Sequence, residues 1–247
     1  MEWSDEAIVL SLRRHGETSG ILEALTRNHG RHLGLVRGGV SPKRRAMLQP
    51  GNLVKVTWRA RLSENLGVFV AELELARAHA MFGNRSALMG LNALAAVANV
   101  ALPEREPHGP AFEGAEALIS AIAEQEFRDW APLFVRWEMG LLDELGFGLD
   151  LSRCAATGAN ENLIYVSPRT GRAVSAEPGA PYHDKLLGLP PFLRGVESTT
   201  HAADVVAGLT LTAHFLQQWV LTPNAKTMPE ARRRLIDLAA SQNPESE

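Results

Sequence analysis

The hydrophobic pattern of this chain changes its period near residue 80, and this change limits the fold more than any other feature. Before residue 80, apolar and polar residues alternate. Residues 53–61 are the clearest example, because Val54, Val56 and Trp58 share one face while Lys55 and Arg59 share the other. A period of two is typical of a half-buried β-strand with one wet face. The pattern predicts strands over residues 7–12, 19–27, 31–37, 53–61 and 67–75.

Five short strands separated by turns rich in glycine and proline predict a small closed barrel, and a five-stranded OB-type barrel is the natural candidate. Trp58 is in phase with Val54 and Val56, so we predict that it lies in the core and is not a base-stacking platform. One face of the first strand and one face of the last are predicted to be apolar, with Ile8, Leu10 and Leu12 on the first and Phe69, Ala71, Leu73 and Leu75 on the last.

After residue 80, apolar residues recur at helical spacing. Helices are predicted over residues 86–101, 113–125, 131–146, 199–221 and 228–241, with Pro132 in the first turn of the third. Residues 148–195 lack this period and contain many glycines and prolines. The sequence therefore predicts an α+β chain, with a barrel domain over residues 1–79 and a helical domain over residues 80–247 that is interrupted by residues 148–195.

Charge is distributed unevenly along the chain. The 247 residues carry a formal net charge of only −3, which by itself indicates no partner. Between Arg13 and Arg61, however, there are 11 lysines and arginines and only two acids, Glu17 and Glu23. Such a segment favours a polyanionic partner. The alternative is a solvated surface without a partner.

Residues 38–49, with the sequence GGVSPKRRAMLQ, are predicted to form a surface loop that carries three consecutive cations. Cations that fan out from a loop suit the phosphates of a flexible strand. The candidate nucleic-acid contacts are Arg37, Lys43, Arg44, Arg45, Lys55, Arg59 and Arg61, with Arg13 and Arg14 as weaker candidates. Arg232, Arg233 and Arg234 suit either DNA or an acidic peptide, or else form a solvated helix face.

Catalytic motifs are absent. The sequence has no GxGxxG, GxxxxGK[ST], HExxH or GxSxG pattern. Asp143 and Glu144 are adjacent and point about 100° apart on a helix, so they do not form a facing carboxylate pair. The one cysteine, Cys154, excludes a disulfide framework and a four-thiolate zinc site, and an inert thiol is expected there.

No segment of the sequence reads as a targeting or membrane signal. The N-terminus lacks the basic and apolar regions of a signal peptide. The longest apolar stretch, residues 205–221, contains His214, Gln217 and Gln218 and is short for a bilayer span. We therefore expect a soluble cytoplasmic protein that does not contact a membrane.

Residues 154–178 preserve the spacing of a zinc ribbon without its ligands. Cys154, Thr157, Ser175 and Pro178 follow the pattern C-x2-T-x17-S-x2-P, where a zinc ribbon has C-x2-C-x15–20-C-x2-C. A single thiol, two hydroxyls and a proline cannot hold structural zinc tightly, because proline offers no side-chain donor atom. We predict that no zinc is bound.

Three segments resemble the RecO family of bacterial recombination mediators: GGVSPKRRAMLQPGN, LLDELGFGLDLSRCAATG and YVSPRTGRAVS. The likeness extends over essentially the whole chain. It implies an N-terminal OB-fold and a helical domain, often with a four-cysteine zinc knuckle. In this sequence only Cys154 keeps its sulfur, and Thr157, Ser175 and Pro178 stand at the other knuckle positions.

The resemblance also implies a function without bond-breaking chemistry or a cofactor. RecO-like proteins bind single- and double-stranded DNA, anneal complementary strands and act with RecR. They also contact the C-terminal tail of single-stranded DNA-binding protein and help to load RecA, which implies association with the nucleoid during repair. These expectations agree with the basic segment, whose cations would lower the repulsion between two strands.

Two other functions stay open on the residues alone. A protein-interaction scaffold would use the barrel to bind a protein partner and would bind DNA negligibly. An RNA- or tRNA-binding module is also consistent with a basic OB-like barrel. An enzyme has the least support.

Overall fold

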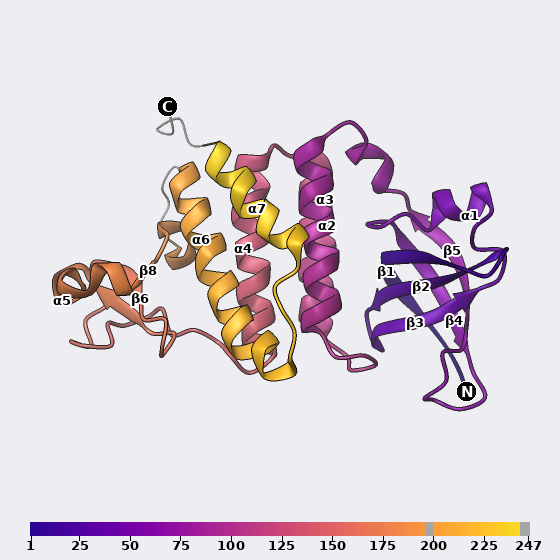
Figure 1. The fold of residues 1–247 in the computed structure, drawn as a ribbon, viewed down its shortest axis with the longest axis horizontal. Helices are drawn as coiled ribbons and strands as arrows, with labels where there is room; N and C mark the ends of the chain where they lie inside the picture. The colour runs from indigo at the N-terminus through magenta and orange to yellow at the C-terminus, as the bar shows by residue number, and fades with distance from the viewer. Residues whose placement is uncertain (196–199, 243–247) are drawn as a thin grey trace. The chain divides into compact units, whose positions relative to one another are not determined.

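The computed structural model describes residues 1–195 and 200–242, and its first part is a five-stranded sheet (Figure 1). The predicted number of strands and their order along the chain are confirmed. A short helix, α1 (Pro42–Met47), lies between the third and fourth strands. The strands are β1 (Glu2–His15), β2 (Ser19–Thr26), β3 (Gly30–Val36), β4 (Leu53–Arg59) and β5 (Val68–Leu75).

The sheet closes on itself in the order β1-β2-β3-β5-β4, and β4 pairs with β1. All neighbours are antiparallel except β3 and β5, which meet in parallel at Leu35 and Val68. The long β1 strand makes the closure, because residues 2–8 pair with β4 and residues 7–15 pair with β2. A β-bulge between Val9 and Ser11 bends the strand where its pairing changes.

Because of this bulge, Ile8, Leu10 and Leu12 do not share one face of β1 as predicted. Ala7 and Val9 belong to the cluster inside the barrel, and Leu12 packs against the same cluster. Ile8 and Leu10 therefore lie on the opposite face from Leu12, where β1 contacts helix α2 (Arg85–Ala101). One inserted residue shifts the alternation by one position and moves the following side chains to the other face.

The barrel core contains the predicted tryptophan. Trp58 is 2% exposed, and its indole N–H donates a hydrogen bond to the carbonyl oxygen of Leu66 at 3.0 Å. Phe69 is buried beside it, as expected. Leu73 lies further along the same face of β5, opposite Val54, and is 46% exposed. The register shifts after it, so that Leu75 pairs with Leu53 and lies on the other face. The predicted place of Leu75 on the face of Phe69 is therefore wrong.

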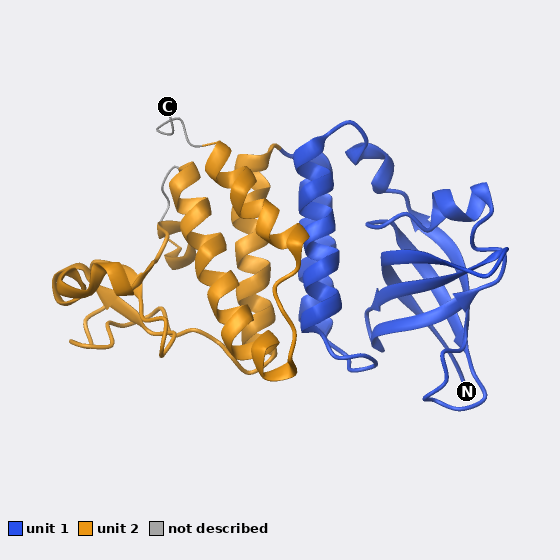
Figure 2. Ribbon diagram, viewed as in Figure 1, with its two compact units in different colours: residues 1–125 blue, residues 126–247 orange. Residues whose placement is uncertain are grey.

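Two further helices belong to the same compact unit as the barrel, which comprises residues 1–125 (Figure 2). They are α2 and α3 (Gly109–Glu124), preceded by a 3₁₀ turn at Ala78–Met81. Both helices were predicted, although α3 begins four residues before the predicted start. The predicted domain boundary between residues 79 and 80 stays a prediction.

The second unit, residues 126–247, contains a further set of helices (Figure 2). They are α4 (Phe127–Glu144), α6 (Ala202–Phe215) with a π-helical continuation at Leu216–Leu221, a 3₁₀ turn at Thr222–Asn224, and α7 (Glu230–Ser241). Pro132 lies inside α4 and not in its first turn as predicted, because the helix begins at Phe127. Residue 199, the predicted start of the fourth helix, lies outside the described residues.

The segment without helical period forms a small antiparallel sheet in the order β7-β6-β8. Its strands are β6 (Leu163–Val166), β7 (Ala173–Ser175) and β8 (Leu187–Gly188). Short helical turns lie between β7 and β8, at α5 (Ala176–Gly179) and Ala180–Lys185, and after β8, at Pro191–Arg194. No helix in the described ranges, 1–195 and 200–242, is long and apolar enough to cross a membrane.

Arg232 is a core residue and not part of a surface cation cluster. Its side chain is fully buried, and its guanidinium donates to both carboxylate oxygens of Glu138 at 2.6 and 2.7 Å. Leu235 and Ala239 are buried on the same helix, one and two turns later. The interpretation of residues 232–234 as three solvent-facing cations is therefore wrong for Arg232. Arg233 and Arg234 are exposed, and both pair with Glu230.

Candidate nucleic-acid interface

The three consecutive cations lie on helix α1 and not on a loop as predicted. Pro42 occupies its first turn, where a fixed φ and a missing N–H are tolerated. The N–H of Arg45 donates to the carbonyl of Ser41 at 2.9 Å, and that of Leu48 donates to the carbonyl of Arg44 at 2.8 Å. A helix of six residues is too short to show a hydrophobic period, so the sequence pattern did not reveal it.

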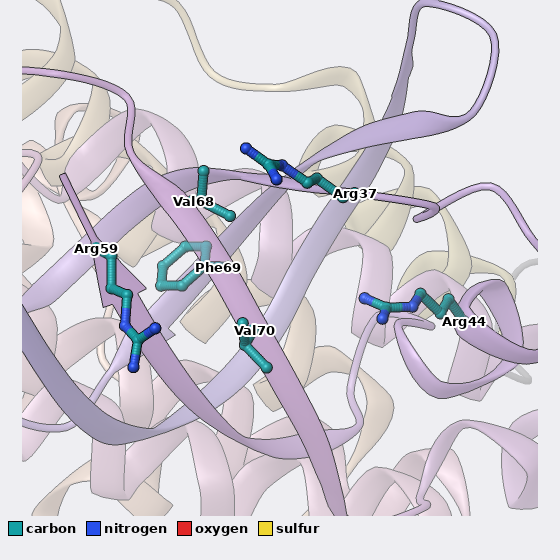
Figure 3. A pocket seen from close by; sticks show the side chains of 6 residues that line it. All are labelled: Arg37, Arg44, Arg59, Val68, Phe69 and Val70. Atoms are coloured by element: carbon teal, nitrogen blue, oxygen red, sulfur yellow. The ribbon is translucent and has the colours of Figure 1, made fainter.

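The helix directs the cations to different sides. Successive side chains on an α-helix are about 100° apart. Arg44 lines a hollow of about 470 Å³ together with Arg37 and Arg59, and we call this the arginine hollow. Its floor is formed by Val68, Phe69 and Val70 of β5. In Figure 3, Arg37 and Arg44 lie on one side of Val70 and Arg59 lies on the other.

The cations on and before α1 are not neutralised by neighbouring acids. Arg37, Lys43 and Arg45 are exposed, and Arg44 is half-buried. Within residues 1–195 and 200–242, none of these four side chains forms an ion pair. Four unpaired cations in this short stretch give the surface a positive potential that attracts anions.

The predicted basic face of β4 has a different charge environment. Arg59 forms an ion pair with Glu2 at 2.7 Å, although both side chains are largely exposed. Lys55 lies directly opposite Glu6 of β1 and Glu72 of β5. Side chains directly opposite on neighbouring strands are close enough to interact. The neighbouring strands thus place carboxylates on both sides of Lys55 and one carboxylate beside Arg59.

The remaining candidate cations lie around the same barrel. Arg13 and Arg14 are exposed near the end of β1, where Arg14 donates to the carbonyls of Gly16 and Glu17 at 3.1 and 3.3 Å. The N–H of Val40 donates to the carbonyl of Thr18 at 3.3 Å, which places this turn beside the chain that leads into α1. Arg61 is exposed in the β4–β5 connection.

Sequence reasoning missed the residue that holds this connection. Arg105 donates hydrogen bonds to the carbonyls of Ser63 and Asn65, the latter at 3.0 Å. Its backbone has a φ of 63°, which is uncommon for a residue other than glycine. The sequence carries no signal for this role, because the contact spans about 40 residues and depends on the folded path of the loop after α2.

The former knuckle positions do not fit a structural zinc ion. The sulfur of Cys154 accepts a hydrogen bond from the backbone N–H of Ser175 at 3.3 Å. The hydroxyl of Ser175 donates to the carbonyl of Glu161 at 3.0 Å, and Pro178 lies within α5. Burial raises the pKa of the Cys154 thiol, but hydrogen bonds from Ser175 and Thr157 outweigh this and lower the pKa to about 6. Hydrogen bonds from the protein itself therefore stabilise the Cys154 sulfur. One thiol alone cannot complete a zinc site.

Metal-ligating side chains do not gather elsewhere in the described parts of the chain. Within them, no group of three or more histidine, cysteine, aspartate or glutamate residues could hold a metal ion. The surface that stands out chemically is therefore the positively charged region around α1.

Comparisons with known proteins give the family. The family model "Recombination protein O N terminal" matches residues 1–78, and the model "Recombination protein O C terminal" matches residues 83–227. The chain is 51% identical over 239 residues to the DNA repair protein RecO of Rhodospirillum centenum, which covers 96% of this chain and 94% of that protein.

Two further relatives support the same assignment. The chain is 49% identical over 249 residues to the DNA repair protein RecO of Methylorubrum populi, with 98% of this chain and 100% of that protein covered. It is 51% identical over 240 residues to the DNA repair protein RecO of Caulobacter vibrioides, with 97% and 98% covered. The chain belongs to the RecO family of bacterial DNA repair proteins.

Proposed function

We propose that this protein is a recombination mediator that binds single- and double-stranded DNA through the barrel surface around α1 and anneals complementary strands. The observation that carries this proposal is the group of four cations without carboxylate partners among the described residues: Arg37, Lys43, Arg44 and Arg45. Further cations extend this surface. Those along and beyond β4 are Lys55, Arg59 and Arg61, and those along β1 are Arg13 and Arg14.

The mechanism is electrostatic. Each phosphate that pairs with a cation releases condensed counterions, so binding is driven by entropy and is independent of base sequence. Two strands held on one cationic surface repel each other less and meet at a higher local concentration, which favours annealing without ATP. The strand order of the barrel is consistent with an OB-type fold, a fold that commonly binds nucleic acid in this way.

Membership of the family supports a wider role in repair. We propose that the protein acts with RecR and with the C-terminal tail of single-stranded DNA-binding protein, and that it helps to load RecA at gaps on the nucleoid. In this role it breaks no covalent bond and needs no cofactor.

Fluorescence anisotropy of labelled oligonucleotides across a salt series tests the DNA-binding step. The comparison is between the wild type and Lys43→Ala/Arg44→Ala/Arg45→Ala. For a single strand, each phosphate contact contributes about 0.7 to the slope of log affinity against log salt concentration. We therefore expect the triple substitution to reduce this slope by about 2 and to slow annealing in parallel.

A matched variant controls for the loss of three charges. Arg128, Arg153 and Arg169 are exposed arginines of the second unit, and replacing them with alanine changes the net charge equally. Equal binding by the wild type and the α1 variant, or no DNA binding at all, contradicts the proposal. Absence of DNA binding with retained partner binding favours the protein scaffold, and a strong preference in competition for RNA favours the RNA-binding module.

A further inference from the structure

A second hollow adjoins α1, and it differs in character from the arginine hollow. It is a groove of about 510 Å³, and we call it the apolar groove. Its position follows from the barrel: Leu73 continues the inner face of Phe69 and Ala71, but it reaches the end of the barrel, where it is 46% exposed. The groove is lined by Lys43, Ala46, Met47, Gln49, Asn52, Leu73, Ala76, Ala78, His79 and Phe82.

Phe82 is the most exposed large apolar residue in this lining, at 64%. Its backbone is nevertheless held in place. The N–H of Phe82 donates to the carbonyl of His79 at 3.3 Å, and the next turn is anchored where the side chain of Asn84 caps α2 by accepting from the N–H of Ala87 at 3.1 Å. An exposed aromatic ring on an anchored backbone is a stacking surface with little conformational entropy to lose.

One of the two amide side chains that line the groove has an oxygen available to a ligand. The side-chain amide of Gln49 donates to the carbonyl of Arg45 at 3.0 Å, and its oxygen accepts no hydrogen bond from a described residue. Asn52, by contrast, is fully used: its amide donates to Ala46 and Met47, and its oxygen accepts from the N–H groups of Arg77 and Ala78. Asn52 therefore shapes the wall, while Gln49 can meet a ligand.

The charge of the groove favours an anionic partner. Among the described residues that line it, one is a lysine and none carries a carboxylate. Glu72 pairs with Lys55 and lies on the other face of β5 from Leu73. Lys43 lines the apolar groove and Arg44 lines the arginine hollow, so α1 presents neighbouring cations to both hollows.

We propose that the apolar groove binds an unstacked base of single-stranded DNA while its flanking phosphates contact the cations of α1. The inference rests on the proposed function and adds to it a site that distinguishes single strands from duplex. The base stacks on Phe82 and contacts Met47 and Leu73, and its polar edge reaches Gln49. Every base has an aromatic face, so such a site tolerates any sequence. Bases inside a duplex are stacked and paired and do not enter it.

The test is anisotropy with three oligonucleotides of equal length: a single strand, the same strand with abasic positions throughout, and the matching duplex. The variant is Phe82→Ala, whose wild-type side chain is too exposed for its loss to endanger folding. We expect a loss of single-strand affinity of about five- to a hundredfold, which is the range for removing one stacking side chain. Duplex and abasic-strand affinities should stay within about twofold, and the salt slope should not change because no charge is removed.

Two further variants test whether the aromatic ring of Phe82 is responsible for the effect. Phe82→Tyr keeps an aromatic ring and should retain single-strand affinity. Tyr182→Ala removes an aromatic side chain that is 59% exposed in the second unit, and it should have no effect. If Phe82→Ala leaves single-strand affinity unchanged, or weakens binding to abasic and normal strands equally, the base site is wrong. That failure is distinct from failure of the proposed function, in which the wild type itself would show no salt-dependent DNA binding.

Discussion

Asp5 shows how a single buried carboxylate organises the turn between β2 and β3. It is 7% exposed, and it accepts hydrogen bonds from the backbone N–H of Asn28 at 2.7 Å and from the Asn28 amide at 2.9 Å. It also contacts Nδ1 of His29 at 2.9 Å. Burial raises the pKa of Asp5, but the hydrogen bonds from His29 and Asn28 outweigh burial and hold the pKa below its ordinary value of 3.8.

This environment gives a pH-dependent prediction for Asp5→Asn. Because the pKa is lower in the folded than in the unfolded protein, the carboxylate stabilises the fold above about pH 3.8, and this stabilisation is lost as the pH falls through the folded-state pKa. We expect the substitution to lower the free energy of unfolding by about 1–3 kcal/mol at pH 7. Urea unfolding at pH 7 and below pH 3 measures the difference, which should shrink in acid. A difference that is independent of pH would contradict this role.

At the scale of an element, β4 shows how strand register changes the meaning of a basic face. Read along the chain, Lys55 and Arg59 belong to a segment almost free of acids. In the sheet they lie beside carboxylates from β1 and β5, including Glu2, which pairs with Arg59 at 2.7 Å. The cations of α1 form no ion pair with any described residue, so we expect them to contribute more to DNA binding than the β4 cations do.

Glu2→Gln tests whether carboxylates on the neighbouring strands weaken the contribution of the β4 cations to DNA binding. The substitution leaves Arg59 without its ion-pair partner and removes one negative charge beside the arginine hollow. An exposed ion pair is worth about 0–1 kcal/mol, so DNA affinity should rise by up to about fivefold. Anisotropy at about 0.1 M salt provides the measurement. Glu124→Gln, an exposed glutamate of α3, makes the same change in net charge, and an equal gain from it would show that only total charge matters.

At the scale of the whole molecule, the compact unit that contains the barrel extends to residue 125. Two arginines of the barrel, one buried and one half-buried, contact residues 102–116 and explain part of this extension. Arg31, 7% exposed, donates to the carbonyl of Leu102 at 3.1 Å, and Arg27 lies 4.6 Å from the ring centre of Phe112 and pairs with Glu116. Removing the helices would expose these side chains and the outer face of β1.

Fragments test how the barrel depends on these helices. We expect residues 1–125 to unfold cooperatively in urea. We expect residues 1–79 to be less stable by several kcal/mol, because Arg31 and Arg27 lose partners and Ile8 and Leu10 become exposed. Equal stability of the two fragments would show that the predicted barrel domain, residues 1–79, is independent of α2 and α3.

Local patterns explain what could be predicted from the sequence. Alternation over a few residues was enough to place five strands and to assign Trp58 to the core, because burial of one strand face is encoded within the strand. Helical spacing placed α2, α3, α4 and α7 for the same reason. The candidate cations were visible because they are contiguous. The bulge in β1 and the helical form of α1 were not predicted, because each involves too few residues to produce a period.

The sequence by itself determined the change from strands to helices, the concentration of positive charge between Arg13 and Arg61, and the loss of all but one zinc-ribbon sulfur. Only the tertiary structure decided which cations are free. Strand pairing brings Glu2 to Arg59 across 57 residues, and core packing buries Arg232 against Glu138 across 94. It also decided that Leu73 and Phe82 border an open groove. The physical reason is that period and composition are local properties of a chain, whereas charge compensation and surface shape depend on contacts between distant segments.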